Sequence, residues 1–226
     1  MPNPFKSLSK KEWALWLSSV ALIAASFIVC KSVSLVTVAS LIGCSGLIFV
    51  SKGHVFGQFL MLAFSITYGI ISLGQQYYGE AITYMGMAGP VAVVSIVLWL
   101  RNPYSSDKTE VKVRKATPRD WLLLSIATVV VTQLFYWILE FFNTNNLVVS
   151  TISVTTSFAA ATLSAMRSPY YALVYALNDV VLIILWSCIL VNDFSYLPMV
   201  VCFVVFLAND IYGLINWKIM EKRQRS

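Results

Sequence analysis

The chain has 226 residues, of which 58% are hydrophobic and only 12% are charged, and its mean hydropathy is +0.76. Soluble domains carry about 25% charged residues, so this composition excludes an ordinary soluble protein and indicates an integral membrane protein. The formal net charge of +6 requires no nucleic-acid partner, because the basic residues fall between apolar segments, where they determine topology.

Apolar segments of near-spanning length follow one another along the chain. A helix needs about 20 residues to cross about 30 Å of hydrocarbon. Eight segments approach or reach this length: 13–30, 33–50, 55–73, 81–100, 121–142, 147–166, 170–191 and 197–217. The spacers hold none of the alternating ten-residue strands that a barrel would need. We therefore predict an all-α integral membrane protein with about seven to eight transmembrane helices.

The basic residues are distributed unequally between the spacers. With the N-terminus inside, every Lys and Arg except Lys31 lies in a cytoplasmic segment. This bias predicts a multi-pass protein of the cell membrane with both termini cytoplasmic. Lys10 and Lys11 precede the first apolar segment, an order that a cleaved signal peptide shares. That segment is long, and no small-residue cleavage site follows it, so we expect a retained first helix.

The four cysteines give no sign of a metal or disulfide site. Cys30, Cys44, Cys188 and Cys202 lie within or at the ends of apolar segments and lack the spacing of metal ligands. We interpret them as small apolar packing residues, and we expect no metal and no cofactor.

The longest polar stretch, 101–120, is a predicted cytoplasmic linker with four apolar segments on each side. A shift of 118 residues superposes three segments of the second half on three of the first without a gap. The pairs that match are Val36 with Val154, Thr37 with Thr155, Ile66 with Ile184, Tyr68 with Trp186, Tyr78 with Tyr196 and Trp99 with Trp217. An even number of spans in each half predicts a parallel repeat, and transporters commonly bind substrate between such repeats.

Two carboxylates lie inside predicted spans of the second half. Asp179 follows Asn178 in segment 170–191, and Asp210 follows Asn209 in segment 197–217. A carboxylate that faces lipid costs about 2.5 to 3.5 kcal/mol even on lenient insertion scales. We therefore expect both aspartates to face protein or water.

Aromatic and amide side chains accompany these carboxylates at helical spacing. Such stripes suit a ligand with a flat base and a sugar, because rings stack and polar groups bond hydroxyls. The alternative is that the polar groups only bond helix to helix. The two predicted stripes are Tyr175, Asp179 and Trp186 in one helix, and Asn209, Tyr212 and Asn216 in the other.

The first half offers fewer candidates. Tyr68 and Tyr84 are aromatic residues within spans, and Tyr84 is the better candidate for a pocket. We interpret Glu80, with the adjacent Gln75 and Gln76, as solvated loop residues. Glycine and proline interrupt the segment that follows, which predicts either a broken helix near a site or close helix packing. The interrupting residues are Gly86, Gly89 and Pro90.

The stretches 77–84, 168–171, 178–179 and 209–217 resemble the PnuC family of vitamin transporters. The Asn-x-x-Tyr pattern at Asn209 and Tyr212 is the most specific part of the resemblance. The family is similar in fold to the SWEET sugar transporters, which have two parallel three-helix bundles joined by a linking helix. The resemblance therefore implies an extra helix in 1–32, bundles in 33–100 and 147–217, a linker in 101–120, a linking helix in 121–142 and a basic cytoplasmic tail in 218–226.

The resemblance implies uptake of nicotinamide riboside by facilitated diffusion, with a cytoplasmic riboside kinase that traps the product. It also implies a homotrimer in the lipid bilayer. No Gly-x-x-x-x-Gly-Lys-Ser/Thr motif occurs, as expected for transport without ATP. The implied substrate-binding residues are Asn178, Asp179, Trp186, Asn209, Asp210, Tyr212, Tyr175, Tyr171, Tyr84 and Tyr68.

One departure from the family pattern concerns the substrate. Members that carry nicotinamide riboside often have a Trp-x-x-Trp pair before the asparagine, where this chain has Tyr171 and Val174. Tyr171 can stack on a ring and Val174 cannot. Thiamine and deoxynucleosides therefore stay open as substrates, although Asp179 and Asp210 favour a cation such as nicotinamide riboside or thiamine.

Two other classes of function are alternatives to transport. An intramembrane hydrolase could use a pair of aspartates, but His54 is the only histidine, and neither aspartate follows a Gly-x-Gly motif. We therefore predict that the protein is not an enzyme. A membrane scaffold without substrate is the remaining alternative. It predicts that Asn178→Ala or Asn209→Ala changes expression but not uptake.

Overall fold

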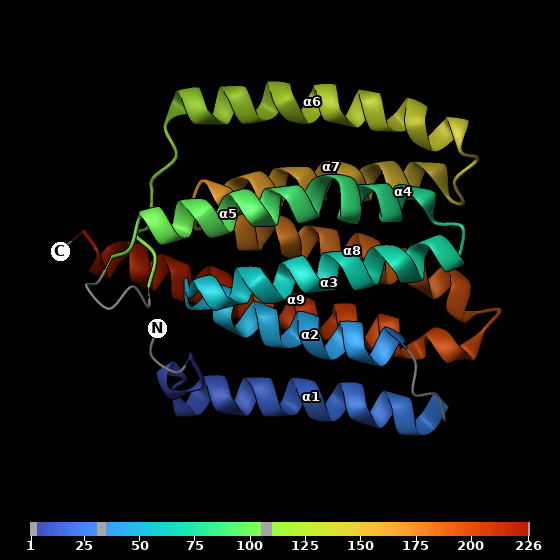
Figure 1. Cartoon of the computed structure of the whole chain (residues 1–226), viewed down its shortest axis with the longest axis horizontal. Helices are drawn as coiled ribbons and strands as arrows, with labels where there is room; N and C mark the ends of the chain where they lie inside the picture. The colour runs from blue at the N-terminus through green and yellow to red at the C-terminus, as the bar shows by residue number, and fades with distance from the viewer. Residues whose placement is uncertain (1–3, 31–34, 105–109, 226) are drawn as a thin grey trace.

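The computed structural model describes residues 4–30, 35–104 and 110–225. Within these ranges it is helical, with the long helices lying side by side (Figure 1). Seven helical stretches in this part of the chain are long and apolar enough to cross a membrane, and α2 is a shorter apolar helix. The prediction of an all-α protein with seven to eight spans is confirmed. Lys31, Lys108 and the expected helix start at 33 lie outside the described residues.

The helices follow the predicted apolar segments closely. The main departure is α9, which continues past the expected end at 217 to Arg223. The bounds are α1 Lys10–Cys30, α2 Leu35–Ser51, α3 Val55–Gly74, α4 Tyr78–Ile82, α5 Gly89–Arg101, α6 Pro118–Phe141, α7 Leu147–Ala165, α8 Tyr171–Leu190 and α9 Leu197–Arg223. A π-helical turn, Thr83–Ala88, joins α4 to α5.

Local capping explains where several helices begin. Thr117 and Asp120 form a reciprocal capping box at the start of α6, with Pro118 at a first-turn position that needs no N–H donor. His54 accepts a hydrogen bond from the backbone N–H of Phe56 at the start of α3. These contacts fix the ends of spans whose apolar sequence alone sets no sharp boundary.

The helices α1 and α6 lie on opposite sides of the molecule, with the other helices between them (Figure 1). Helix α1 packs against α2 and α9, whereas α6 packs mainly against α7. Both described chain ends and the segment that leads into α6 lie at the same end of the helices (Figure 1). This end carries the basic residues that the topology argument places inside.

Contacts between the two halves agree with the predicted repeat. Helix α2 packs against α9, and α7 packs against the stretch from α4 to α5, which is the reciprocal arrangement under the 118-residue shift. Trp186 donates a hydrogen bond of 2.7 Å from Nε1 to the Tyr68 hydroxyl. The ring centroids of Trp99 and Trp217 lie 5.5 Å apart. Equivalent residues that touch must lie near a two-fold axis, so these two contacts locate the axis between the halves.

Candidate functional site

A cavity lies between the halves, bounded by α2, α3, α5, α7, α8 and α9. Five of the ten residues expected to bind substrate line it: Tyr84, Tyr175, Asn178, Asp179 and Asp210. The structure therefore brings together, at one place inside the helices, residues that are up to 126 positions apart in the chain, from Tyr84 to Asp210.

Small residues create the space. Ala88 on the π-helical turn and Ala161 on α7 both line the cavity. Under the 118-residue shift, Ala88 corresponds to Phe206 and Ala161 corresponds to Gly43. The Phe206 ring packs directly against Gly43, because a Cβ added to Gly43 would lie 2.2 Å from that ring. The pair of alanines leaves the equivalent volume open in the other half. Phe206 itself also lines the cavity, so the two repeats contribute side chains of different size to its wall.

Two acidic side chains dominate the electrostatics of the cavity. Asp179 and Asp210 are each only 3% exposed, and their carboxyl groups lie close enough to interact with each other. Asp179 Oδ2 has no hydrogen-bond partner among the described residues. No Lys or Arg of the described part of the chain lines the cavity. Two buried carboxyl groups without a counter-charge favour a ligand that is cationic or rich in donors.

Asn178 is held by hydroxyl groups of α7. Its Oδ1 accepts hydrogen bonds from Thr156 at 2.7 Å, Ser157 at 3.2 Å and Ser153 at 3.4 Å. The oxygen of the amide is thus used in helix packing, and its NH₂ group is the part that can donate to a ligand. Asn178 can therefore serve in helix packing through its Oδ1 and in ligand binding through its NH₂ group.

Tyr84 lies on the π-helical turn Thr83–Ala88. The N–H of Gly89 donates to the carbonyl of Tyr84, five residues back, and Pro90 then has no N–H to restore the α-helical pattern. The break expected from the glycine and proline residues is present, and it takes the form of a widened turn. This turn places the Tyr84 ring in the cavity wall.

Tyr68, Trp186 and Tyr171 are buried beside the cavity but are not in its wall. The rings of Tyr68 and Tyr84 are tilted against each other, with centroids 4.3 Å apart, and the Tyr68 hydroxyl accepts a hydrogen bond from Trp186. Tyr171 packs against Trp217 with a centroid distance of 5.0 Å. These rings support the wall from behind.

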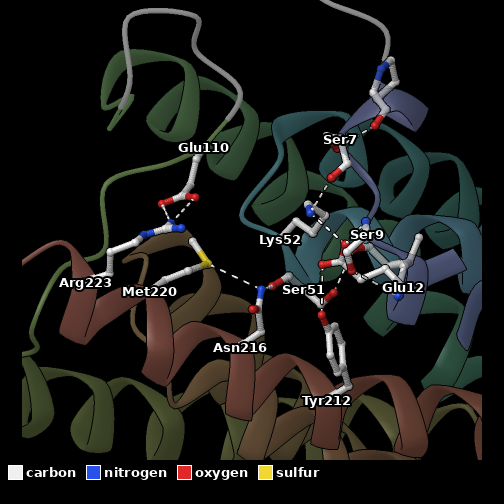
Figure 2. Close-up of polar contacts among 12 residues, drawn as sticks. Ser7, Ser9, Glu12, Ser51, Lys52, Glu110, Tyr212, Asn216, Met220 and Arg223 are labelled. Carbon is white, nitrogen blue, oxygen red and sulfur yellow. Dashed lines mark hydrogen bonds and ion pairs between the residues drawn. The ribbon is translucent and has the colours of Figure 1, made fainter.

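Asn209 and Tyr212 face α1 instead of the cavity. Asn209 Nδ2 donates to Ser19 Oγ at 3.2 Å, and the Tyr212 hydroxyl donates to Glu12 Oε1 at 2.9 Å. Glu12 also accepts a 2.8 Å bond from Lys52 (Figure 2). The predicted stripe of α9 does share one face, because Asn216 donates to Ser51 O on the same side. That face holds the first helix in place.

The structure contradicts the interpretation of Glu80 as a solvated loop residue. Glu80 is fully buried, and its Oε2 lies 3.4 Å from the Tyr68 hydroxyl. The short helix α4 begins at Tyr78 and carries Glu80 into the protein in its first turn. Of the two neighbouring glutamines, Gln75 is half-buried and bonds Tyr196, while Gln76 is exposed as expected.

Gln58 is a cavity residue that the sequence argument missed. It is buried on α3, and its Nε2 donates to Ser164 Oγ at 3.1 Å. Both residues line the cavity. The sequence did contain a signal for Gln58, because an amide side chain inside an apolar span is the same feature that indicated Asn178. The lining serines gave no such signal, because hydroxyl groups are common at helix contacts in membranes.

Comparison with known proteins identifies the family. A family model described as nicotinamide mononucleotide transporter matches residues 33–219. The chain belongs to this family. A nicotinamide riboside transporter PnuC from Neisseria mucosa is 27% identical over 84% of this chain and 73% of its own length. Another PnuC, from Haemophilus influenzae, is 26% identical over 82% of this chain and 80% of its own length.

A solved structure of a family member supports the fold. The crystal structure of the vitamin B3 transporter PnuC matches with a TM-score of 0.85 at 25% sequence identity, covering 96% of this chain and 94% of that chain. Membership confirms the resemblance seen in the sequence and the predictions of a multi-pass membrane protein and of a transporter instead of an enzyme.

Proposed function

We propose that the protein transports nicotinamide riboside across the cell membrane and that the cavity between its halves is the binding site. The observation that carries this proposal is the pair Asp179 and Asp210, buried in the cavity wall beside Tyr84 and Tyr175. The nicotinamide ring of the riboside is flat and cationic. Tyrosine rings can stack on it. The carboxyl groups can interact with its positive charge, and carboxyl and amide groups can form hydrogen bonds with the ribose hydroxyls.

The charge of the cavity wall favours the riboside over the mononucleotide named in the family description. A phosphate would bring negative charge next to Asp179 and Asp210, where no basic side chain of the described residues lies in the wall. Like charges at short range in a site of low dielectric are strongly unfavourable. The uncharged ribose of the riboside avoids this repulsion.

Transport in this proposal is facilitated diffusion. The cavity has a volume of about 40 Å³, which holds a few water molecules but not a nucleoside. The substrate therefore enters a wider state, open to one side of the membrane at a time, as expected for repeats that rock against each other. A cytoplasmic kinase that phosphorylates the riboside then prevents its return and produces net uptake.

Calorimetry on the purified protein tests the choice of substrate. Nicotinamide riboside, nicotinamide mononucleotide, thiamine and a deoxynucleoside are titrated side by side. The proposal predicts binding of the riboside and none of the mononucleotide. Binding of thiamine or of the deoxynucleoside alone would move the same site to another substrate, and binding of none would favour the scaffold alternative.

A further inference from the structure

A second hollow lies at the end of the molecule where the chain termini are found. The segment before α6, the first turn of α6, the turn between α7 and α8, and the last turns of α9 surround it. Its wall includes Lys115, Trp121, Ser168, Tyr170, Lys218 and Arg225. None of these residues contributes to the cavity between the halves.

The charges around this hollow are mostly positive. Lys115, Lys218 and Arg225 face a single carboxylate, Glu221. Lys218 lies 3.4 Å from that carboxylate and 3.8 Å from the centre of the Tyr170 ring, and Arg225 pairs with the same carboxylate. Lys115 has no ion pair among the described residues. One negative charge is thus shared by two cations, and a third cation is left over.

Two further observations indicate an anion. Ser168 is 1% exposed, and its Oγ has no hydrogen-bond partner among the described residues although it lines the hollow. Helix α8 starts just after it, and its N-cap residue Tyr170 makes no side-chain cap bond in the described structure. The positive end of a long helix and a free hydroxyl therefore face the same place as the lysines.

Two arginines lie near this hollow in the chain, and one of them, Arg114, is already paired with Asp120 at 2.8 Å. Partial burial, and then the charge of Arg114, lower the pKa of Arg167 in the turn between α7 and α8. The backbone N–H of Arg114 donates to the carbonyl of Arg167 at 3.0 Å, so the two residues are held together. Arg167 therefore adds positive charge one residue before Ser168, which lines the hollow.

We infer that this hollow is a binding site for a phosphate group at the membrane surface. A phosphate offers several acceptor oxygens, which match two ammonium groups, a guanidinium group and the free hydroxyl of Ser168. The headgroup of an anionic phospholipid or a soluble phosphate compound can supply it. Trp121 and Tyr170 are partly exposed beside the site, as aromatic residues are at the boundary between membrane and water.

Two binding measurements on the full-length protein distinguish the sources. Native mass spectrometry in detergent counts bound phosphatidylglycerol and, for comparison, zwitterionic phosphatidylcholine. Calorimetry measures inorganic phosphate. Both are repeated with Lys115→Gln, Lys218→Gln and Ser168→Ala, and with Lys222→Gln as the matched control, because Lys222 is exposed on the same end of α9 and does not line the hollow.

We expect each lysine variant to weaken binding about fivefold and Ser168→Ala to weaken it about tenfold, with no change for Lys222→Gln. Loss confined to phosphatidylglycerol identifies a lipid site, and loss confined to inorganic phosphate identifies a site for a soluble compound. The inference would be overturned if Lys115→Gln bound phosphatidylglycerol and inorganic phosphate as tightly as Lys222→Gln does. It would also be overturned if the unchanged protein bound neither ligand. Lys115 is exposed and unpaired, so its variant keeps the test valid if the others fold poorly. Riboside binding is a separate measurement, and its outcome does not decide this one.

Discussion

At the scale of single residues, Asp179 and Asp210 determine the charge of the cavity wall. A carboxylate within an apolar span has few tolerable environments, so Asp179 and Asp210 had to face protein or water, and the structure puts both in the cavity wall. Helical spacing also showed that Asn209 and Tyr212 share a face. Spacing does not say which neighbour that face meets, and the neighbour is α1.

The first prediction concerns the charge of Asp210. Asp210→Asn keeps the size of the side chain but removes a negative charge from the wall, so nicotinamide riboside should bind about 10- to 100-fold more weakly. Calorimetry measures this, with Asp193→Asn as the control, because Asp193 is exposed in the turn before α9. Unchanged affinity in Asp210→Asn would remove this residue from the site.

The second prediction concerns the contact between Tyr212 and the first helix. Tyr212→Phe removes the hydroxyl that donates to Glu12, a bond to a charged group that contributes about 2 kcal/mol. We expect a lower thermal midpoint in detergent and an unchanged affinity for nicotinamide riboside. An affinity loss as large as that of Asp210→Asn would instead place Tyr212 at the substrate.

At the scale of the elements, the irregular helix between Tyr78 and Arg101 is the feature that opens the site. Glycine and proline in its middle predicted a break, and the break is the π-helical turn that carries Tyr84 and Ala88. The type of turn depends on which carbonyl Gly89 bonds, and composition does not determine that. The boundaries of the other spans were predictable because apolar runs end where polar or capping residues begin.

Ala88 tests this element directly. Ala88→Phe places in the first half the residue that Phe206 provides at the equivalent position of the second. The ring should fill the cavity and abolish detectable riboside binding, while the protein still elutes as a folded species in size-exclusion chromatography. Val93→Phe is the control, since Val93 is 46% exposed on the same helix. Normal binding by Ala88→Phe would show that the substrate does not occupy this cavity.

At the scale of the whole molecule, the sequence predicted a membrane protein with two related halves, and contacts between equivalent residues agree with that symmetry. The division into two bundles with a linking helix stays a prediction. The position of α1 was not predictable, because it depends on hydrogen bonds that Tyr212 and Asn209 of α9 donate to Glu12 and Ser19, which lie about 200 positions away in the chain.

Orientation in the membrane is a prediction of the same scale. The basic residues gather at the end that holds both termini, so this end should be cytoplasmic. A green fluorescent protein fused after Ser226 should fluoresce in cells, and alkaline phosphatase fused at the same place should be inactive. An active phosphatase fusion would reverse the assigned orientation.

The most direct test of the central claim is uptake of labelled nicotinamide riboside into liposomes that contain only this protein. Facilitated diffusion predicts that the internal concentration rises to the external concentration and no further. A riboside kinase and ATP enclosed in the liposomes should then drive accumulation beyond that level. No uptake above protein-free liposomes, or accumulation above the external concentration without the kinase, would contradict the account.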